Sequence, residues 1–254
     1  DAFDLGQRQR APQAAPDAIV SQAKFESQPD PATKGVLVDM AGLFLGDLEG
    51  MSLALKAVLE TPYALDGGGS SFVAMKGYPD NLDFEMILNY KTQEAKNRPT
   101  YAADPRSLLI RFYYSISKLP GDGYRPRLAD DRVGHFVTVM DDYADESLDT
   151  PAVRYVNRWR LEKKDPNAAL SEPKQPIVFY LENTIPAEYR GAVKRGIEAW
   201  NAAFEAAGFK NAIQAKDQPE DPNWNAADVR YASIRWIVAP GAGFAQGPSR
   251  VNPY

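Results

Sequence analysis

Residues 176–240 read PIVFYLENTIPAEYRGAVKRGIEAWNAAFEAAGFKNAIQAKDQPEDPNWNAADVRYASIRWIVAP, and this stretch decides the fold of the C-terminal part of the chain. Its first six residues form a short apolar run bounded by prolines and by Asn183, which is typical of a buried strand. Residues 211–216 and 231–239 predict two further strands. The order is therefore strand, long helix, strand, loop, strand.

The long helix is predicted between the first two of these strands. Pro186 suits its first turn, where a missing N–H costs no hydrogen bond. Gly208 ends it, because glycine enters the left-handed C-cap region without a Cβ clash. One apolar face recurs at helical spacing over residues 189–207. It consists of Tyr189, Val193, Ile197, Trp200 and Phe204.

Upstream of this stretch the chain has a different pattern. Residues 1–34 are rich in Ala, Gln, Pro and Asp and predict an extended or disordered arm. Within residues 35–165, the segments 82–91 and 108–116 alternate apolar and polar residues, as half-buried strands do. Further short strands are predicted over 36–38 and 135–140, a helix over 51–59, and a loop or turn tip over 67–71, where three glycines precede two serines.

These segments predict an α+β fold with two domains. The first, residues 35–165, is a mainly antiparallel β domain, and residues 171–254 form a second, α/β domain. Residues 163–167 mark the boundary between them, and residues 171–176, with two prolines, form a stiff connector. The loop over residues 217–228 contains Trp224, which we interpret as an anchor of that loop rather than a ligand contact.

Composition excludes several classes of function. The 254 residues carry a net charge of −5, which argues against nucleic-acid binding, and contain no cysteine, so thiolate and disulfide chemistry are absent. No apolar run is long enough to span a bilayer. The first residue is Asp and no signal peptide is visible, so we expect a processed or truncated chain.

The chain contains a single histidine, His135, whereas a catalytic zinc site uses about three protein ligands. We therefore interpret His135 as structural and predict neither a catalytic residue nor a metal ligand within this chain. The glycines at 67–69 lack the Lys-Ser/Thr of a phosphate-binding loop. For Arg125, Arg127 and Arg132 we favour ion pairs with the nearby Asp130 and Asp131 over a carboxylate-binding patch.

Several longer segments carry a family resemblance. Residues 191–210 (GAVKRGIEAWNAAFEAAGFK), 230–236 (RYASIRW) and 247–253 (GPSRVNP) resemble the first part of the protease domain of bacterial Met-zincin-type zinc-dependent metalloproteases. Residues 126–136 (PRLADDRVGHF), 154–163 (RYVNRWRLEK) and 169–173 (ALSEP) resemble the domain that precedes it. The resemblance covers roughly residues 35–254, but the family's His-Glu-x-x-His segment is absent from this chain.

The resemblance implies that residues 171–254 form part of a zincin-like α/β unit, a twisted sheet with one long helix packed on it. It implies a zinc cofactor and a zinc-activated water in the parent protein, a peptide or protein substrate, and a periplasmic or secreted location. A substrate would pair with an edge strand at the cleft rim, formed by Ser249, Arg250, Val251 and Asn252. This chain alone is predicted to be inactive, and the missing C-terminal catalytic segment is an expected partner.

Two alternatives remain open from the sequence. One is a non-catalytic binding or scaffold module in which the β domain binds a partner or masks a protease cleft. The other is a noncovalent partner of a separate catalytic fragment.

Overall fold

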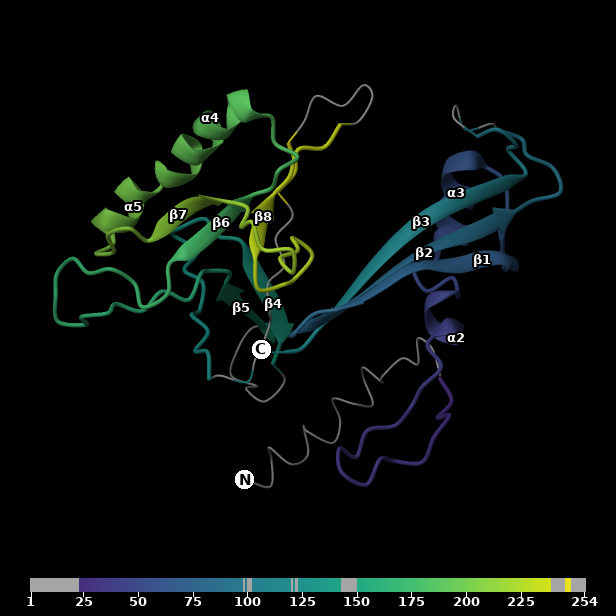
Figure 1. The fold of residues 1–254 in the computed structure, drawn as a ribbon, viewed down its shortest axis with the longest axis horizontal. Helices are drawn as coiled ribbons and strands as arrows, with labels where there is room; N and C mark the ends of the chain where they lie inside the picture. Colours follow the sequence, from purple (N-terminus) through teal and green to yellow (C-terminus); the bar gives the residue numbers. More distant parts are fainter. Residues whose placement is uncertain are drawn as a thin grey trace. The chain divides into compact units, whose positions relative to one another are not determined.

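The computed structural model describes residues 23–97, 99, 102–119, 121, 123–142, 150–238 and 245–247. The fold mixes helices with a larger share of strands (Figure 1). In chain order the elements are α2 (Ala41–Phe44), α3 (Met51–Leu59), β1 (Ala64–Gly77), β2 (Asn81–Lys91), β3 (Ser107–Ser117), β4 (Val137–Asp141), β5 (Ala152–Val156), β6 (Ile177–Leu181), α4 (Ala187–Glu198), α5 (Asn201–Ala206), β7 (Ile213–Asp217) and β8 (Ala232–Ile234).

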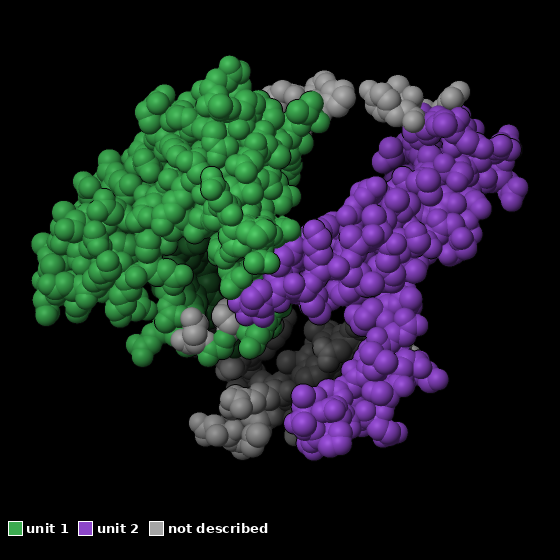
Figure 2. All heavy atoms as spheres, in the orientation of Figure 1, with its two compact units in different colours: residues 1–9, 117–254 green, residues 10–116 purple. Residues whose placement is uncertain are grey.

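Two compact units make up the chain, one within residues 10–116 and the other within residues 117–254 (Figure 2). The boundary lies inside the range 35–165 that the sequence predicts as one domain. The strands β4 and β5 therefore group with the C-terminal unit. The predicted domain limits remain predictions.

The first unit is built on a sheet in the order β1-β2-β3, with β1 antiparallel to β2. The alternation predicted for residues 82–91 and 108–116 is confirmed only over residues 84–90 and 108–114, where the even-numbered residues contact the core. Leu82 and Ile116 differ and are 51% and 44% exposed; Leu82 pairs with Gly77 next to the turn of the β1–β2 hairpin. The helix predicted over residues 51–59 is α3.

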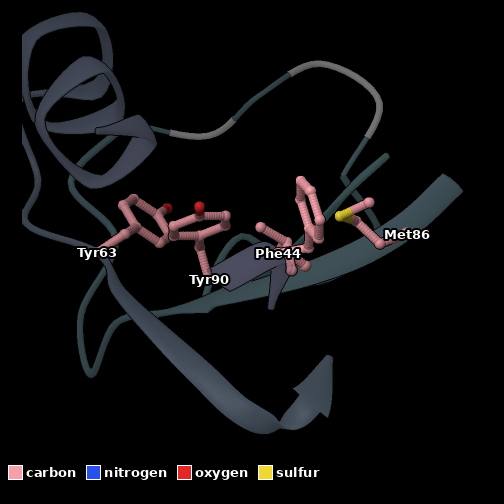
Figure 3. Close-up of a cluster of buried hydrophobic side chains, with 5 residues drawn as sticks. Phe44, Tyr63, Met86 and Tyr90 are labelled. Carbon is pink, nitrogen blue, oxygen red and sulfur yellow. The ribbon is translucent and has the colours of Figure 1, made fainter. Parts of the chain in front are cut away.

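The core of this unit consists of Phe44, Tyr63, Met86, Leu88 and Tyr90, and Figure 3 shows four of these side chains gathered together. The rings of Phe44 and Phe84 stack with their centroids 4.7 Å apart. The hydroxyl of the fully buried Tyr90 donates to Asp47 Oδ1 at 2.8 Å. Burial, followed by this hydrogen bond, raises the pKa of Tyr90 well above its ordinary value.

The prediction of a loop at residues 67–71 is wrong, because these residues lie inside β1. Between the pairs Asp66–Asn89 and Ser71–Ile87, β1 advances by five residues and β2 by two, so the extra residues form a bulge. A Cβ on Gly69 would lie 2.5 Å from Asn89 Nδ2 and 2.7 Å from Asp66 Oδ2, so any other residue there would displace these side chains. The strand predicted over 36–38 reduces to one bridge, between Val38 and Phe25.

The second unit contains the antiparallel pair β4–β5 and a parallel sheet in the order β7-β6-β8. The strands predicted at 176–181 and 211–216 are confirmed as β6 and β7. The strand predicted over 231–239 is shorter, since β8 ends at Ile234. Its neighbour β6 ends at Leu181, directly opposite Ile234, so the following residues have no strand to pair with.

The single helix predicted over residues 189–207 is two helices, α4 and α5. They meet at Trp200, where backbone hydrogen bonds span three residues instead of four. Trp200 N–H donates to Ile197 O at 3.3 Å, and Ala202 N–H donates to Ala199 O at 3.4 Å. The predicted stop is confirmed, because Gly208 has φ +89° and Phe209 N–H bonds back to Phe204 O at 2.8 Å.

The predicted apolar face of this helix is only partly buried. Val193, Ile197 and Phe204 are half-buried, whereas Tyr189 and Trp200 are 46% and 64% exposed. A stripe of polar residues on the same helix, among them Glu198 and Asn201, contacts the edge of the parallel sheet at β7 instead. The prediction that Tyr189 and Trp200 pack with Val193, Ile197 and Phe204 is therefore wrong.

Candidate functional site

The outer edge of β7 is covered by side chains of α4 and α5, which run alongside it (Figure 1). Asn201 Nδ2 donates to Ile213 O at 2.8 Å, and Ile213 N–H donates to Asn201 Oδ1 at 3.2 Å. Ala215 N–H donates to Glu198 Oε1 at 3.3 Å. These are the backbone groups that an added strand would use, so we call this the closed edge.

The same polar stripe continues to the carboxyl end of β7, where Asp217 accepts hydrogen bonds from Arg190 and Lys194. Arg190 also donates to Leu181 O at 3.1 Å and to Glu182 O at 3.0 Å, which joins the ends of β6 and β7. Lys194 and then Arg190 lower the pKa of Asp217. Arg190, Lys194 and Asp217 thus bond to one another and to the backbone of β6, so we assign this cluster a structural role.

The opposite edge of the sheet, along β8, is open. Glu182 N–H donates to Ile234 O at 3.0 Å, so Ile234 points its backbone groups toward β6. The N–H and C=O groups of successive residues point to opposite sides of a strand, so those of Ser233 and Arg235 point away from β6. The described part of the chain gives β8 no second strand partner. We call this the open edge.

Apolar side chains adjoin the open edge. Trp236, Ile237 and Val238 are 44%, 79% and 86% exposed. The ring of Trp236 stacks on that of Tyr189 with centroids 5.2 Å apart and planes 5° from parallel. Trp236 N–H donates to Thr184 Oγ1 at 3.1 Å, and Arg235 Nε lies 3.2 Å from Glu182 Oε1, so the loop between β6 and α4 holds this segment in place.

An open strand edge beside exposed apolar side chains suits an extended peptide. The main chain of the peptide hydrogen-bonds to the edge, and its alternate side chains contact the apolar residues. An arrangement of this kind can bind and orient an extended chain through main-chain hydrogen bonds.

Ring contacts fix the loop between β7 and β8. Trp224 packs 5.9 Å from Tyr180 and 5.7 Å from Tyr231, between ring centroids, which confirms its interpretation as a loop anchor. The nearly buried Asp228 carboxylate pairs with Arg230 at 2.6 Å, and this contact lowers the pKa of Asp228. The ring contacts of Trp224 and the Asp228–Arg230 ion pair hold the start of β8 in place.

The sequence-predicted rim residues Ser249, Arg250, Val251 and Asn252 lie outside the described residues. His135 is exposed and precedes β4. Among the residues that the structure describes, no group of three His, Cys, Asp or Glu side chains is placed to hold a metal ion. None of the described helices has the length and apolar character needed to cross a bilayer.

The predicted ion pair between Arg132 and Asp130 is confirmed at 2.6 Å, and it lowers the pKa of Asp130 to about 2. Asp131 instead lies 3.4 Å from Arg154, and Arg125 contributes its carbonyl oxygen to Arg158 at 3.0 Å.

Sequence reasoning missed both the closed edge and the Tyr189–Trp236 stack. The closed edge had a visible signal, because its polar residues recur at steps of four, four and three. They are Arg190, Lys194, Glu198 and Asn201. The stack had none, since its two residues lie on separate elements.

Comparison with known proteins gives one match. A family model described as "Domain of unknown function (DUF5117)" matches residues 4–164. No curated protein and no solved structure matches the chain.

Proposed function

Because this chain belongs to the DUF5117 family, for which no function is defined, we propose its role from the open edge and the sequence resemblance. The chain is the non-catalytic N-terminal portion of a zinc-dependent metallopeptidase. In the parent protein it binds and orients an extended peptide, and the hydrolytic groups come from residues outside this chain.

The observation that carries the proposal is the parallel sheet β7-β6-β8 with its open edge at β8. The chain crosses from β6 to β7 through α4 and α5, which agrees with the helix-on-sheet unit that the resemblance implies. The open edge and the exposed Trp236, Ile237 and Val238 offer an extended peptide both main-chain and side-chain contacts. Under this proposal Ser249, Arg250, Val251 and Asn252 also take part in binding the peptide.

The residues of this chain do not fit a catalytic zinc site. Such a site uses about three protein ligands, most often with histidine among them. The chain has one histidine, which is exposed, and no three of its described His, Asp and Glu side chains form a group that could hold a metal ion. Zinc in the parent protein therefore rests on the resemblance alone, as does a periplasmic or secreted location.

The test compares two polypeptides. The 254-residue chain and a version extended with the downstream gene sequence are each assayed for bound zinc by elemental analysis and for chelator-sensitive cleavage of labelled casein. We expect zinc and cleavage only with the extended chain, and a His-Glu-x-x-His segment within the extension. Stoichiometric zinc with zinc-dependent cleavage by the shorter chain would refute the proposal, and so would an inactive extended chain without that segment.

A non-catalytic binding or scaffold module is the second candidate, because the open edge requires no chemistry to be useful. It predicts binding of extended peptides by the 254-residue chain and no hydrolysis by the extended one. If the chain is instead the noncovalent partner of a separate catalytic fragment, the two fragments mixed in solution will regain cleavage and co-elute.

A further inference from the structure

The second unit contains a cavity of about 350 Å³ beside the closed edge. Three parts of the chain form it: the segment around Lys164 and Glu172, the junction of α4 and α5, and the beginning of β7. Its volume lies within the range of small-ligand sites. The apolar part of its lining comes from Pro173, Pro176 and the buried Ile213.

Hydrogen bonds fix the walls of this cavity. Lys164 N–H donates to Glu172 O at 2.9 Å, and Asn211 Nδ2 donates to Glu172 Oε1 at 3.2 Å. On the opposite side, Asn201 is held by its two bonds to Ile213. The cavity is therefore preformed and does not require a rearrangement to accept a ligand.

The charges in the lining leave one carboxylate available. Lys164 Nζ lies 2.8 Å from Glu172 Oε2, so these two groups neutralise each other. Glu198 accepts one hydrogen bond, from Ala215 N–H to its Oε1, and makes no ion pair with any described residue. The lining thus has a net charge of −1 from one lysine and two glutamates.

We propose that this cavity binds one positively charged amine or guanidinium group on a short aliphatic stem. Glu198 accepts hydrogen bonds from the cation, and Ile213 with the two prolines contacts the stem. Because Asn201 and Glu198 already occupy the backbone groups of β7, recognition takes place through the cationic group and not through an added strand. The cation could be a basic side chain of a peptide or a free small amine, and the site does not depend on the proposed peptidase role.

The test uses the ¹⁵N-labelled full chain and follows backbone amide shifts during titration. Agmatine represents a free amine, Nα-acetyl-arginine methylamide represents a peptide side chain, and Nα-acetyl-citrulline methylamide is the neutral isostere of the latter. We expect saturable shifts of the Ile213 and Gln214 amides with at least one cationic probe and none with the neutral one. Tighter binding of the capped arginine assigns the site to peptides, and tighter binding of agmatine assigns it to free amines.

Matched variants complete the design. Glu198→Gln keeps an oxygen for Ala215 N–H but removes the charge, and we expect affinity to fall about tenfold, the value of one partly exposed charge-assisted bond. Glu205→Gln removes a charge from the exposed Glu205 of α5, outside the cavity lining, and should leave affinity unchanged. Equal losses in both variants, equal binding of the neutral probe, or shifts spread over the surface would overturn the proposal. The neutral-probe comparison uses the unaltered chain, so it holds even if a variant fails to fold.

Discussion

Replacing Asn201 by alanine should destabilise the C-terminal unit, because Asn201 supplies both hydrogen-bond partners of Ile213 on the closed edge. The bonds measure 2.8 and 3.2 Å, and Ile213 is only 7% exposed. An unsatisfied buried donor or acceptor costs about 1–3 kcal/mol. The higher helix propensity of alanine returns at most about 0.7 kcal/mol. With partial access of water to the vacated site, we expect a net loss of about 2–3 kcal/mol.

The assay for Asn201→Ala is urea denaturation combined with amide hydrogen exchange. We expect a lower transition midpoint and faster exchange at Ile213, with no change in the unit that contains β1–β3. Asn201→Asp keeps an acceptor for Ile213 N–H but places a negative charge against Ile213 O, so it should lose at least as much stability. Glu205→Ala is the matched control on an exposed position of α5. A loss below about 0.5 kcal/mol, the usual limit for a neutral surface change, with unchanged exchange would refute the reasoning.

Three further predictions concern single positions. The pKa of Asp217 is lowered below its ordinary 3.8, so its ion pairs stabilise the fold fully above that value and lose their effect as pH falls through the lowered pKa. Asp217→Asn should therefore reduce stability at pH 7 and flatten the loss of stability below about pH 4 in acid titrations followed by circular dichroism. Gly69→Ala should cost about 1–3 kcal/mol in thermal or urea unfolding, because its Cβ would lie 2.5 Å from Asn89 Nδ2, whereas Gly68→Ala, with 3.6 Å to Asp66 Oδ1, should cost less. Tyr90→Phe removes the 2.8 Å bond to Asp47 and should cost about 1.5–3 kcal/mol; a stability equal to that of the unaltered chain would show that water replaces this bond.

The elements that the sequence predicted well are those decided by local physics. The apolar residues at even positions from 84 to 90 lie on the sheet face that packs on the core, and Gly208 ends the helix because its φ of +89° is strained for other residues. Both signals lie within a few residues of the feature they predict.

The elements that the sequence missed depend on contacts between distant residues. The glycines at 67–69 resemble a turn, yet they lie in a bulge of β1, where Asn89 of the facing strand comes within 2.5 Å of a Cβ on Gly69. Trp200 fits the apolar repeat of its helix, but the side chain of the neighbouring Asn201 hydrogen-bonds to the backbone of Ile213, which pairs with no described strand on that side. Apolar periodicity does not reveal such a contact, because the signal for this contact lies in the polar residues of the helix, which recur at steps of four, four and three.

The most direct test of the central claim is amide hydrogen exchange along the two edges of the parallel sheet, with and without an extended peptide. Our account predicts slow exchange at Ile213 and Ala215 throughout, since both N–H groups are already bonded. It predicts fast exchange at Ser233 and Arg235 in the chain alone and protection of both when the peptide is added. Protection that arises at β7, or a peptide that binds while Ser233 and Arg235 still exchange fast, would contradict it.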